Sequence, residues 1–291
     1  MTMTTNAFDA QYPDIAWCPG CGNFKILEIV QGALNALNLD PCSVVMVSGI
    51  GQAAKAPHYV KANFFNGLHG RALPAATAIK ASNPALSVIV ESGDGDLYGE
   101  GGNHLLHAIR RNPDITVLAH DNMVYGLTKG QASPTSQKGF QTPVQLHGVT
   151  LEPMNPVALA IAMNASFVAR GFCGDLDHCR GLINAAIRHR GFALVDILQP
   201  CVTFNRLNTF GWFKKNTYAL EEEYDRSDRI QAFARALEVN QIPLGIIFQE
   251  EGRPTFEDNL GIYENDPRPL FQRSIDRDRL QQLLDGSFAL D

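Results

Sequence analysis

The sequence predicts an α/β protein with a doubly wound, mostly parallel sheet and a C-terminal extension. Short β-branched runs alternate with longer amphipathic segments between residues 25 and 198, and this alternation is typical of a sheet with helices on both faces. The run 43–48 is apolar almost throughout, which indicates a strand buried on both faces. Beyond Cys201 the periodicity weakens. Residues 1–202 are therefore expected to form one domain, and 203–291 an extension that packs on it or on a partner.

The individual elements follow from hydrophobic spacing. Ile26, Ile29, Leu34 and Leu37 lie on one stripe of a helix, because residues three and four apart share a helix face. The predicted helices are 25–38, 70–82, 102–111, 156–165, 176–190, 227–238 and about 276–285. The predicted strands are 43–48, 86–91, 114–119, 166–169, 192–198 and 243–249. Pro74 is compatible with the second helix only if it lies in the first turn.

Composition narrows the functional class. The chain has 291 residues, a net charge of −6 and 45% hydrophobic residues, which excludes collagen, a wholly disordered chain and a disulfide-dense miniprotein. The acidic excess argues against nucleic-acid binding. No apolar run approaches the roughly 20 residues of a membrane span, and the N-terminus resembles no secretory signal. A cytoplasmic protein that binds no membrane is expected, in which the six cysteines serve as metal ligands or core residues.

Acidic and amide side chains follow two neighbouring predicted strands. Asp94 lies in a Gly-Asp-Gly turn directly after the strand 86–91, and Asn122 follows the next strand. Glycines let the backbone approach a bound phosphate, and ligands of such sheets bind beyond the carboxyl ends of the strands. One carboxylate beside phosphate oxygens favours Mg²⁺, which prefers oxygen ligands. A solvated turn is the alternative for Gly-Asp-Gly alone, but the paired placement favours a metal–diphosphate site.

This pair resembles the motif of thiamine diphosphate enzymes, which begins with Gly-Asp-Gly and ends in Asn. The resemblance implies that Asp94, Asn122 and the carbonyl of Val124 hold Mg²⁺. It also implies the fold of the family's pyrophosphate-binding domain.

A Cys-x-x-Cys loop, Cys18 to Cys21, precedes the first predicted helix. Two thiolates at this spacing can bind zinc or an iron–sulfur cluster, or can form a redox pair. No thioredoxin-like strand precedes the loop, so the redox pair is the least favoured of the three.

The order of motifs narrows the resemblance further. Cys-Pro-Gly-Cys-Gly is followed by Ser-Gly-Ile-Gly (48–51), Leu-His-Gly-Arg (68–71), Gly-Asp-Gly-Asp (93–96) and Tyr-Gly-Leu-Thr (125–128). Over about residues 16–205 the chain resembles the β subunit of 2-oxoacid:ferredoxin oxidoreductases. The cofactor-binding residues that this resemblance implies are Gly49, Ile50, His69, Gly93, Asp94, Gly95, Asp96, Asn122, Val124, Gly126, Leu127 and Thr128.

The family's β subunit also binds one [4Fe-4S] cluster, and here the chain departs from the pattern. Cys18, Cys21 and Cys201 match three ligands, but Gln52 stands where the fourth cysteine is expected. Cys42 belongs at the opposite end of the strand, more than about 15 Å away. The alternatives are a cluster with an unusual fourth ligand, which is favoured, a three-iron cluster, a ligand from a partner, or no cluster. Cys173 and Cys179 are further candidates, although Cys179 lies within a helical pattern.

The resemblance implies CoA-dependent oxidative decarboxylation of a 2-oxoacid, reversible in direction, with electrons passed through the cluster to ferredoxin. It also implies a paired α subunit, which supplies the glutamate that activates thiamine diphosphate. An α₂β₂-like assembly is expected, because the first 16 residues are too short for a pyrimidine-binding domain.

Three side chains are candidates for substrate contact. His69 is a candidate acid–base partner, and Arg71 a candidate partner of a carboxylate or phosphate; the alternatives are a structural histidine and a solvated arginine. Lys55 follows the Gly-rich turn 49–51, where a cation would favour a second carboxylate. A similar basic residue in the 2-oxoglutarate branch of the family makes 2-oxoglutarate the expected substrate, ahead of pyruvate and branched-chain 2-oxoacids.

Two other classes remain. A non-redox thiamine diphosphate decarboxylase needs Asp94 and Asn122 but not the cysteines. A zinc-stabilised nucleotide-binding protein would use Cys18 and Cys21 structurally. Iron, sulfide, zinc and thiamine diphosphate analysis separates them.

Overall fold

A computed structural model describes residues 6–10 and 14–287 of the chain. The strands are β1 (Val44–Ser48), β2 (Asn63–Asn66), β3 (Ser87–Gly93), β4 (Thr116–Asp121), β5 (Phe167–Phe172), β6 (Ala193–Leu198), β7 (Thr217–Ala219) and β8 (Ile242–Gln249). The helices are α1 (Gly22–Ala36), α2 (Ala72–Ser82), α3 (Gly102–Arg111), α4 (Pro156–Ala162), α5 (Leu176–Arg188), α6 (Phe210–Asn216), α7 (Arg229–Ala236), α8 (Phe256–Leu260) and α9 (Arg277–Ser287). Shorter helical segments are η1 (Pro41–Ser43), η2 (Ala53–Tyr59), η3 (Gly95–Glu100) and η4 (Leu270–Gln272).

The strands of the described residues form one eight-stranded sheet in the order β2-β1-β3-β4-β6-β5-β8-β7. From β2 to β5 all neighbours are parallel, whereas β8 runs antiparallel to β5. The residues of β4, β5 and β6 are all buried. This burial on both faces explains why these strands read as continuous apolar runs, and it confirms the predicted fold class.

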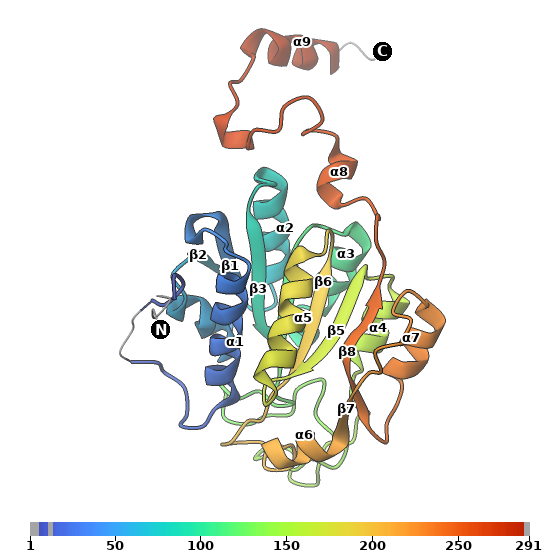
Figure 1. Cartoon of the computed structure of the whole chain (residues 1–291). Coiled ribbons are helices and arrows are strands. Elements are labelled where there is room, and N and C mark those ends of the chain that lie inside the picture. Colours follow the sequence, from blue (N-terminus) through green and yellow to red (C-terminus); the bar gives the residue numbers. More distant parts are fainter. Residues whose placement is uncertain (1–5, 11–13, 288–291) are drawn as a thin grey trace, which may run out of the picture.

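Two apolar cores lie on opposite faces of the sheet (Figure 1). Helices α1 and α5 cover one face, and α2, α3 and α4 cover the other. The segment after β8 leaves the sheet at the end opposite α6, and α9 stands away from the body in Figure 1. No helix among the described residues is both long and apolar enough to cross a lipid bilayer.

The predicted elements are present, with shifted ends. The first helix begins at Gly22 rather than at residue 25, because Cys21 is its N-terminal cap residue. The second begins at Ala72 rather than at residue 70, since Gly70 has a φ of +66° and breaks the helical backbone. Pro74 lies in its first turn, as expected. The strand predicted over 114–119 is shifted to Thr116–Asp121, which brings Asp121 into the sheet.

Elements that sequence periodicity did not predict are β2, β7, α6 and α8, together with the shorter helical segments. All four residues of β2 are exposed, so this edge strand carries no burial pattern. Strands β7 and β8 extend the same sheet through β5. Part of the segment 203–291 therefore continues the core sheet, and its packing on a partner stays a prediction.

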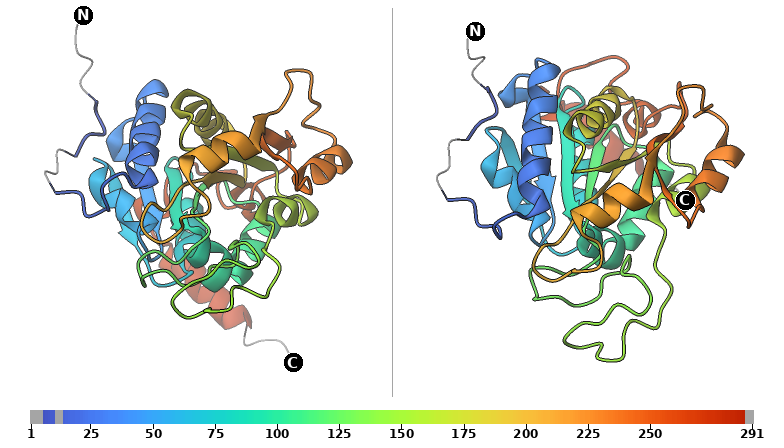
Figure 2. Two further views of the ribbon diagram at one scale, coloured as in Figure 1. Left: turned by 90° about the horizontal axis from the view of Figure 1, so that it is seen from below. Right: turned by 60° about the horizontal axis from the view of Figure 1, so that its bottom comes forward.

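The carboxyl ends of the parallel strands share one edge of the sheet with long connections. The longest is the irregular loop 122–155 between β4 and α4. Figure 2 shows this loop, in green, at the same end of the molecule as α6. The Gly-rich turns after β1, β3 and β4 come together at this edge of the sheet, and they line one cavity there. The candidate site therefore lies at the carboxyl ends of the parallel strands.

Candidate functional site

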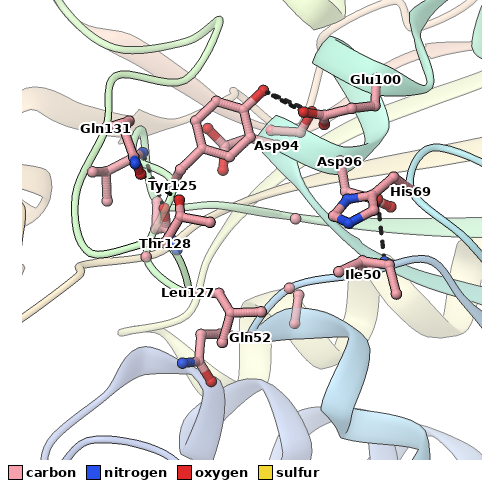
Figure 3. A pocket seen from close by; sticks show the side chains of 17 residues that line it. Ile50, Gln52, His69, Asp94, Asp96, Glu100, Tyr125, Leu127, Thr128 and Gln131 are labelled. Atoms are coloured by element: carbon pink, nitrogen blue, oxygen red, sulfur yellow. Dashed lines mark hydrogen bonds between the residues drawn. The ribbon is translucent and has the colours of Figure 1, made fainter. Parts of the chain in front are cut away.

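A cavity of about 340 Å³ lies at the carboxyl ends of β1, β3 and β4 (Figure 3). Its walls are the turns that follow these strands, together with His69 from the connection between β2 and α2. The lining residues are Ile50, Gly51, Gln52, Ala53, His69, Gly93, Asp94, Gly95, Asp96, Glu100, Asn122, Val124, Tyr125, Gly126, Leu127, Thr128 and Gln131. Strand ends brought together in this way form the usual ligand site of a doubly wound sheet.

The predicted cofactor residues converge on this cavity. All of the predicted cofactor-binding residues line the cavity except Gly49. A Cβ atom at Gly49 would fall 1.9 Å from Oδ2 of Asp96. Glycine is therefore needed at position 49 to let the Asp96 carboxylate approach the backbone.

Asp96 joins three segments around the cavity. Its Oδ1 accepts hydrogen bonds from the backbone N–H of Ile50 at 3.1 Å and of Gly70 at 2.8 Å, and its Oδ2 accepts one from the Ser92 hydroxyl at 2.7 Å. Hydrogen bonds to a charged acceptor contribute about 1.5–3 kcal/mol each. Asp96 thus positions the turn after β1 and the loop that carries His69.

Asp94 faces the cavity from the end of β3 and is almost completely buried. Its Oδ2 accepts a hydrogen bond at 2.7 Å from the Thr135 hydroxyl, which also lies 2.8 Å from Oδ1 of Asp121. Burial raises the pKa of Asp94 to about 6, although hydrogen bonds from Ser133 and Thr135 oppose the shift. Burial, followed by the charges of Asp196 and Asp94, raises the pKa of Asp121 well above its usual range. A cation beside Asp94 would offset this accumulation of buried negative charge.

The turn after β4 places oxygen atoms on the same cavity. Asn122 and Val124 both line it, and the Val124 N–H donates to Oδ1 of Asn122 at 3.0 Å. Met123 between them has a φ of +57°, a conformation that non-glycine residues adopt at a cost. Ser136 holds this turn by donating its hydroxyl to the Met123 carbonyl at 2.6 Å. The predicted magnesium ligands therefore come from neighbouring strands and share one cavity, which fits the oxygen ligands that Mg²⁺ prefers.

A buried ion pair between Arg170 on β5 and Asp196 on β6 lies close to Asp94 and Asp121. Nε of Arg170 lies 3.0 Å from Oδ2 of Asp196, and the Tyr98 hydroxyl donates to Oδ1 of Asp196 at 2.8 Å. Burial, and then the negative charges of Asp196 and Asp121, raise the pKa of Tyr98 well above its usual range. The Arg170 guanidinium thus compensates the Asp196 carboxylate on β6, and its charge opposes only in part the rise in the pKa of Asp121.

Sequence reasoning missed Tyr125, Glu100, Gln131, Gly51, Gln52 and Ala53 as lining residues. Tyr125 forms one wall. Its hydroxyl oxygen lies 3.2 Å from Oε1 of Glu100 and 3.3 Å from the Gly95 carbonyl oxygen, and its one proton can be donated to either. A Cβ atom at Gly95 would meet the Tyr125 ring at 2.2 Å. From the sequence, the two glycines of the Gly-Asp-Gly turn indicated only that the backbone approaches a ligand closely. They did not predict that an aromatic ring packs against Gly95.

The three candidate substrate residues are placed differently. His69 is exposed and lines the cavity. Arg71 is exposed at the start of α2 and does not line it. Lys55 lies on η2, outside the lining, and its Nζ donates to the backbone carbonyl of Ala16 at 3.1 Å. The expected substrate roles of Arg71 and Lys55 stay predictions.

The predicted cluster cysteines lie near one another at the N-terminus of α1. The charges of Cys201 and Cys18 both act on the Cys21 thiol, whose pKa is raised mainly by burial. The Gln199 amide donates to Cys21 Sγ at 3.8 Å. A Cβ atom at Gly20 would lie 4.0 Å from Cγ1 of Val202, so the loop 18–21 contacts the segment that carries Cys201. Three soft ligands from two segments suit an iron–sulfur cluster.

No group of three or more His, Cys, Asp or Glu side chains in residues 6–10 and 14–287 is arranged to hold a single metal ion. Of the other cysteines, Cys42 lies in η1 before β1, at the strand end opposite Gln52, as predicted. Cys179 is buried in the apolar core on α5. Cys173 is buried too, and its Sγ would lie 3.2 Å from a Cβ atom at Gly22.

Comparisons with protein families and with individual relatives agree with one another. Residues 42–197 match the family "Thiamine pyrophosphate enzyme, C-terminal TPP binding domain". Residues 201–276 match the family that covers the C-terminal part of the pyruvate ferredoxin oxidoreductase beta subunit. A 2-oxoacid:ferredoxin oxidoreductase subunit beta from Sulfolobus sp is 46% identical over 270 residues, 87% of each chain.

Two further matches name 2-oxoglutarate. The 2-oxoglutarate oxidoreductase subunit KorB of Mycobacterium tuberculosis is 44% identical over 192 residues, 66% of this chain and 52% of that one. The structure of 2-oxoglutarate:ferredoxin oxidoreductase from Magnetococcus marinus, with 2-oxoglutarate, coenzyme A and succinyl-CoA bound, superposes with a TM-score of 0.89. It is 35% identical, and the match covers 95% of this chain and 94% of that one.

Proposed function

Because the chain belongs to the β subunits of 2-oxoacid:ferredoxin oxidoreductases, we propose that it binds thiamine diphosphate with Mg²⁺ in the cavity and an iron–sulfur cluster at its cysteines. The observation that supports the first part most directly is the convergence of Asp94, Asn122 and Val124 on one cavity. Asp94 and the turn after β4 would hold the metal, and the Gly-rich turns would leave room for the diphosphate.

Thiamine diphosphate supplies the electron sink for decarboxylation of a 2-oxoacid, and the cluster accepts electrons one at a time. The chain's own residues orient these groups. Asp96 fixes the turns that carry Ile50 and His69, and Tyr125 with Gly95 shapes the wall. His69, exposed on the cavity, is proposed to exchange a proton with the substrate.

We propose 2-oxoglutarate as the substrate, converted reversibly with CoA to succinyl-CoA and CO₂. The similarity to two proteins named for 2-oxoglutarate supports this choice over pyruvate and branched-chain 2-oxoacids. Lys55 is proposed to favour the second carboxylate, for which it would have to exchange its bond to the Ala16 carbonyl. A paired α subunit, which would complete the site with a glutamate, and ferredoxin as the acceptor are proposed as partners.

The test uses the chain co-expressed anaerobically with its α subunit. Thiamine diphosphate, magnesium, iron and sulfide are measured, and a panel of 2-oxoacids is assayed with CoA and a viologen dye. Bound thiamine diphosphate without iron and sulfide would instead favour a non-redox decarboxylase, an alternative that Gln52 at a cysteine position keeps open. No bound thiamine diphosphate would refute the proposal.

Substrate choice is tested with Lys55→Ala, and the exposed Lys61 gives the matched control Lys61→Ala. Lys55→Ala is expected to raise the KM for 2-oxoglutarate far more than the KM for pyruvate. Equal effects on both substrates would contradict the role of Lys55.

A further inference from the structure

We propose that Gln52 supplies the fourth ligand of the iron–sulfur cluster, through its side-chain amide oxygen, beside the thiolates of Cys18, Cys21 and Cys201. The inference rests on the proposed function, since it requires a cluster at these cysteines. It goes further by assigning the position at which the chain departs from the four-cysteine pattern.

The first support is the state of the Gln52 side chain. Its Oε1 is buried and has no hydrogen-bond partner among the described residues. A buried carbonyl oxygen without a partner has lost its hydration and gained no hydrogen bond in exchange, which destabilises the folded chain. A buried polar atom without a partner needs an explanation, and one explanation is that the atom binds a metal ion.

The second support is the position of Gln52 against the cysteine loop. The indole N–H of Trp17, next to Cys18 in sequence, donates to the Gln52 carbonyl at 2.8 Å. Three residues after Gln52, Nζ of Lys55 donates to the Ala16 carbonyl at 3.1 Å. Two hydrogen bonds thus hold the segment 52–55 against the segment 16–18. In Figure 3 the Gln52 amide points away from Asp94 and Asp96.

Other side chains near the cysteines are less suited to the role. Oε1 of Gln199 is also buried without a partner, but the Gln199 amide turns its N–H end to Cys21 Sγ at 3.8 Å. That is the geometry of a hydrogen bond that tunes a ligand rather than of a ligand itself. Cys173 belongs to the apolar core behind Gly22 and is fully buried. Cys42 lies at the far end of β1.

An oxygen ligand gives the cluster two properties. The site would have three soft thiolates and one harder oxygen, so the iron at Gln52 would be held more weakly than the other three. Gln52 also lines the cavity, so this residue would connect the proposed cluster site to the proposed thiamine diphosphate site. When ferricyanide removes one electron from an oxidised [4Fe-4S] cluster, Fe²⁺ can leave and a [3Fe-4S] cluster remains. This loss is expected to be reversible on addition of Fe²⁺ and a reductant.

The experiment measures iron and sulfide content and EPR spectra of the αβ complex before and after one equivalent of ferricyanide. In the wild-type complex, the signal of an oxidised three-iron cluster is expected to appear and to vanish when Fe²⁺ and dithionite are added. Gln52→Ala removes the proposed ligand, so this variant is expected to contain less of the fourth iron than the wild type already before ferricyanide is added, with a three-iron EPR signal in its place. Gln52→Glu, which keeps an oxygen, is expected to retain this iron, and Gln52→Cys is expected to prevent its loss. Cys173→Ala is the matched control and is expected to behave as the wild type.

Some outcomes would overturn the assignment alone. These are four irons retained equally by the wild type and Gln52→Ala, or loss of the fourth iron in Cys173→Ala but not in Gln52→Ala. A complex that binds thiamine diphosphate but no iron or sulfide would refute the cluster itself, and with it this inference. Thiamine diphosphate content, measured on every variant, separates a local effect from a failure to fold.

Discussion

Replacing Thr135 with valine is expected to weaken Mg²⁺ binding by about 10–100-fold, because the Thr135 hydroxyl orients a proposed metal ligand without touching the metal. Its oxygen lies 2.7 Å from Oδ2 of Asp94 and 2.8 Å from Oδ1 of Asp121. A threonine hydroxyl has one proton to donate. It therefore serves one carboxyl at a time and fixes how Asp94 presents its other oxygen to the cavity.

The magnitude follows from the single hydrogen bond that is lost. A hydrogen bond to a charged group contributes about 1.5–3 kcal/mol, and each 1.4 kcal/mol corresponds to about a tenfold change in a binding constant. Valine keeps the shape of threonine, so little is lost through packing. The result agrees with the range seen for side chains that support metal ligands.

Isothermal titration of Mg²⁺ into the αβ complex with saturating thiamine diphosphate measures the effect. Thr150→Val is the control, because Thr150 lies in the same loop and is exposed. If Thr135→Val bound Mg²⁺ within twofold of the wild type, Asp94 would not depend on Thr135, and the reasoning would be refuted.

Three further perturbations test other parts of the structure. Gly95→Ala places a methyl group against the Tyr125 ring at 2.2 Å and is expected to abolish thiamine diphosphate binding by titration, whereas Gly102→Ala, where a Cβ meets nothing within 4 Å, should bind normally. Asp196→Asn leaves a buried guanidinium without its charged partner and is expected to cost about 3–5 kcal/mol in urea unfolding; a loss below 1 kcal/mol would contradict a buried ion pair. Burial lowers the pKa of His189 below its ordinary value of 6.5. As the pH falls below 6.5, this histidine therefore takes up a proton in the unfolded chain before it does so in the folded chain, and the free energy of unfolding should decrease. Above pH 6.5 the histidine is neutral in both states and this loss of stability should be absent. In His189→Gln this dependence should flatten, and unfolding profiles parallel to the wild type from about pH 5 to 8 would disprove it.

The parts of the site that sequence could predict are those that act locally. Asp94 and Asn122 each follow a buried strand, and strand order alone brings such positions to one edge. The glycines in these turns also indicated the site, because a residue without a side chain lets the backbone approach a ligand or a neighbouring segment closely.

The parts that could not be predicted depend on contacts between distant segments. Asp96 was expected to bind the cofactor, but its carboxylate also joins the backbone of Ile50 and Gly70. Thr135 lies in a loop without periodicity, and only the fold brings it to Asp94. No sequence pattern records which hydroxyl will meet which carboxylate.

The same limit applies to the edge strand β2. Phe64 and Phe65 on β2 are about half exposed, so burial does not impose an alternating pattern on the strand. By contrast, the central strands were found because both of their faces are covered.

The hydrogen bond from Trp17 to the Gln52 carbonyl has a practical consequence. The chain has two tryptophans, and the other, Trp212, lies on α6. A Trp212→Phe variant would therefore emit from Trp17 alone, a buried indole packed edge-on against Phe24 and Tyr59. Its fluorescence would give an intrinsic optical record of events at the junction between the cavity and the cysteine loop, without any attached dye.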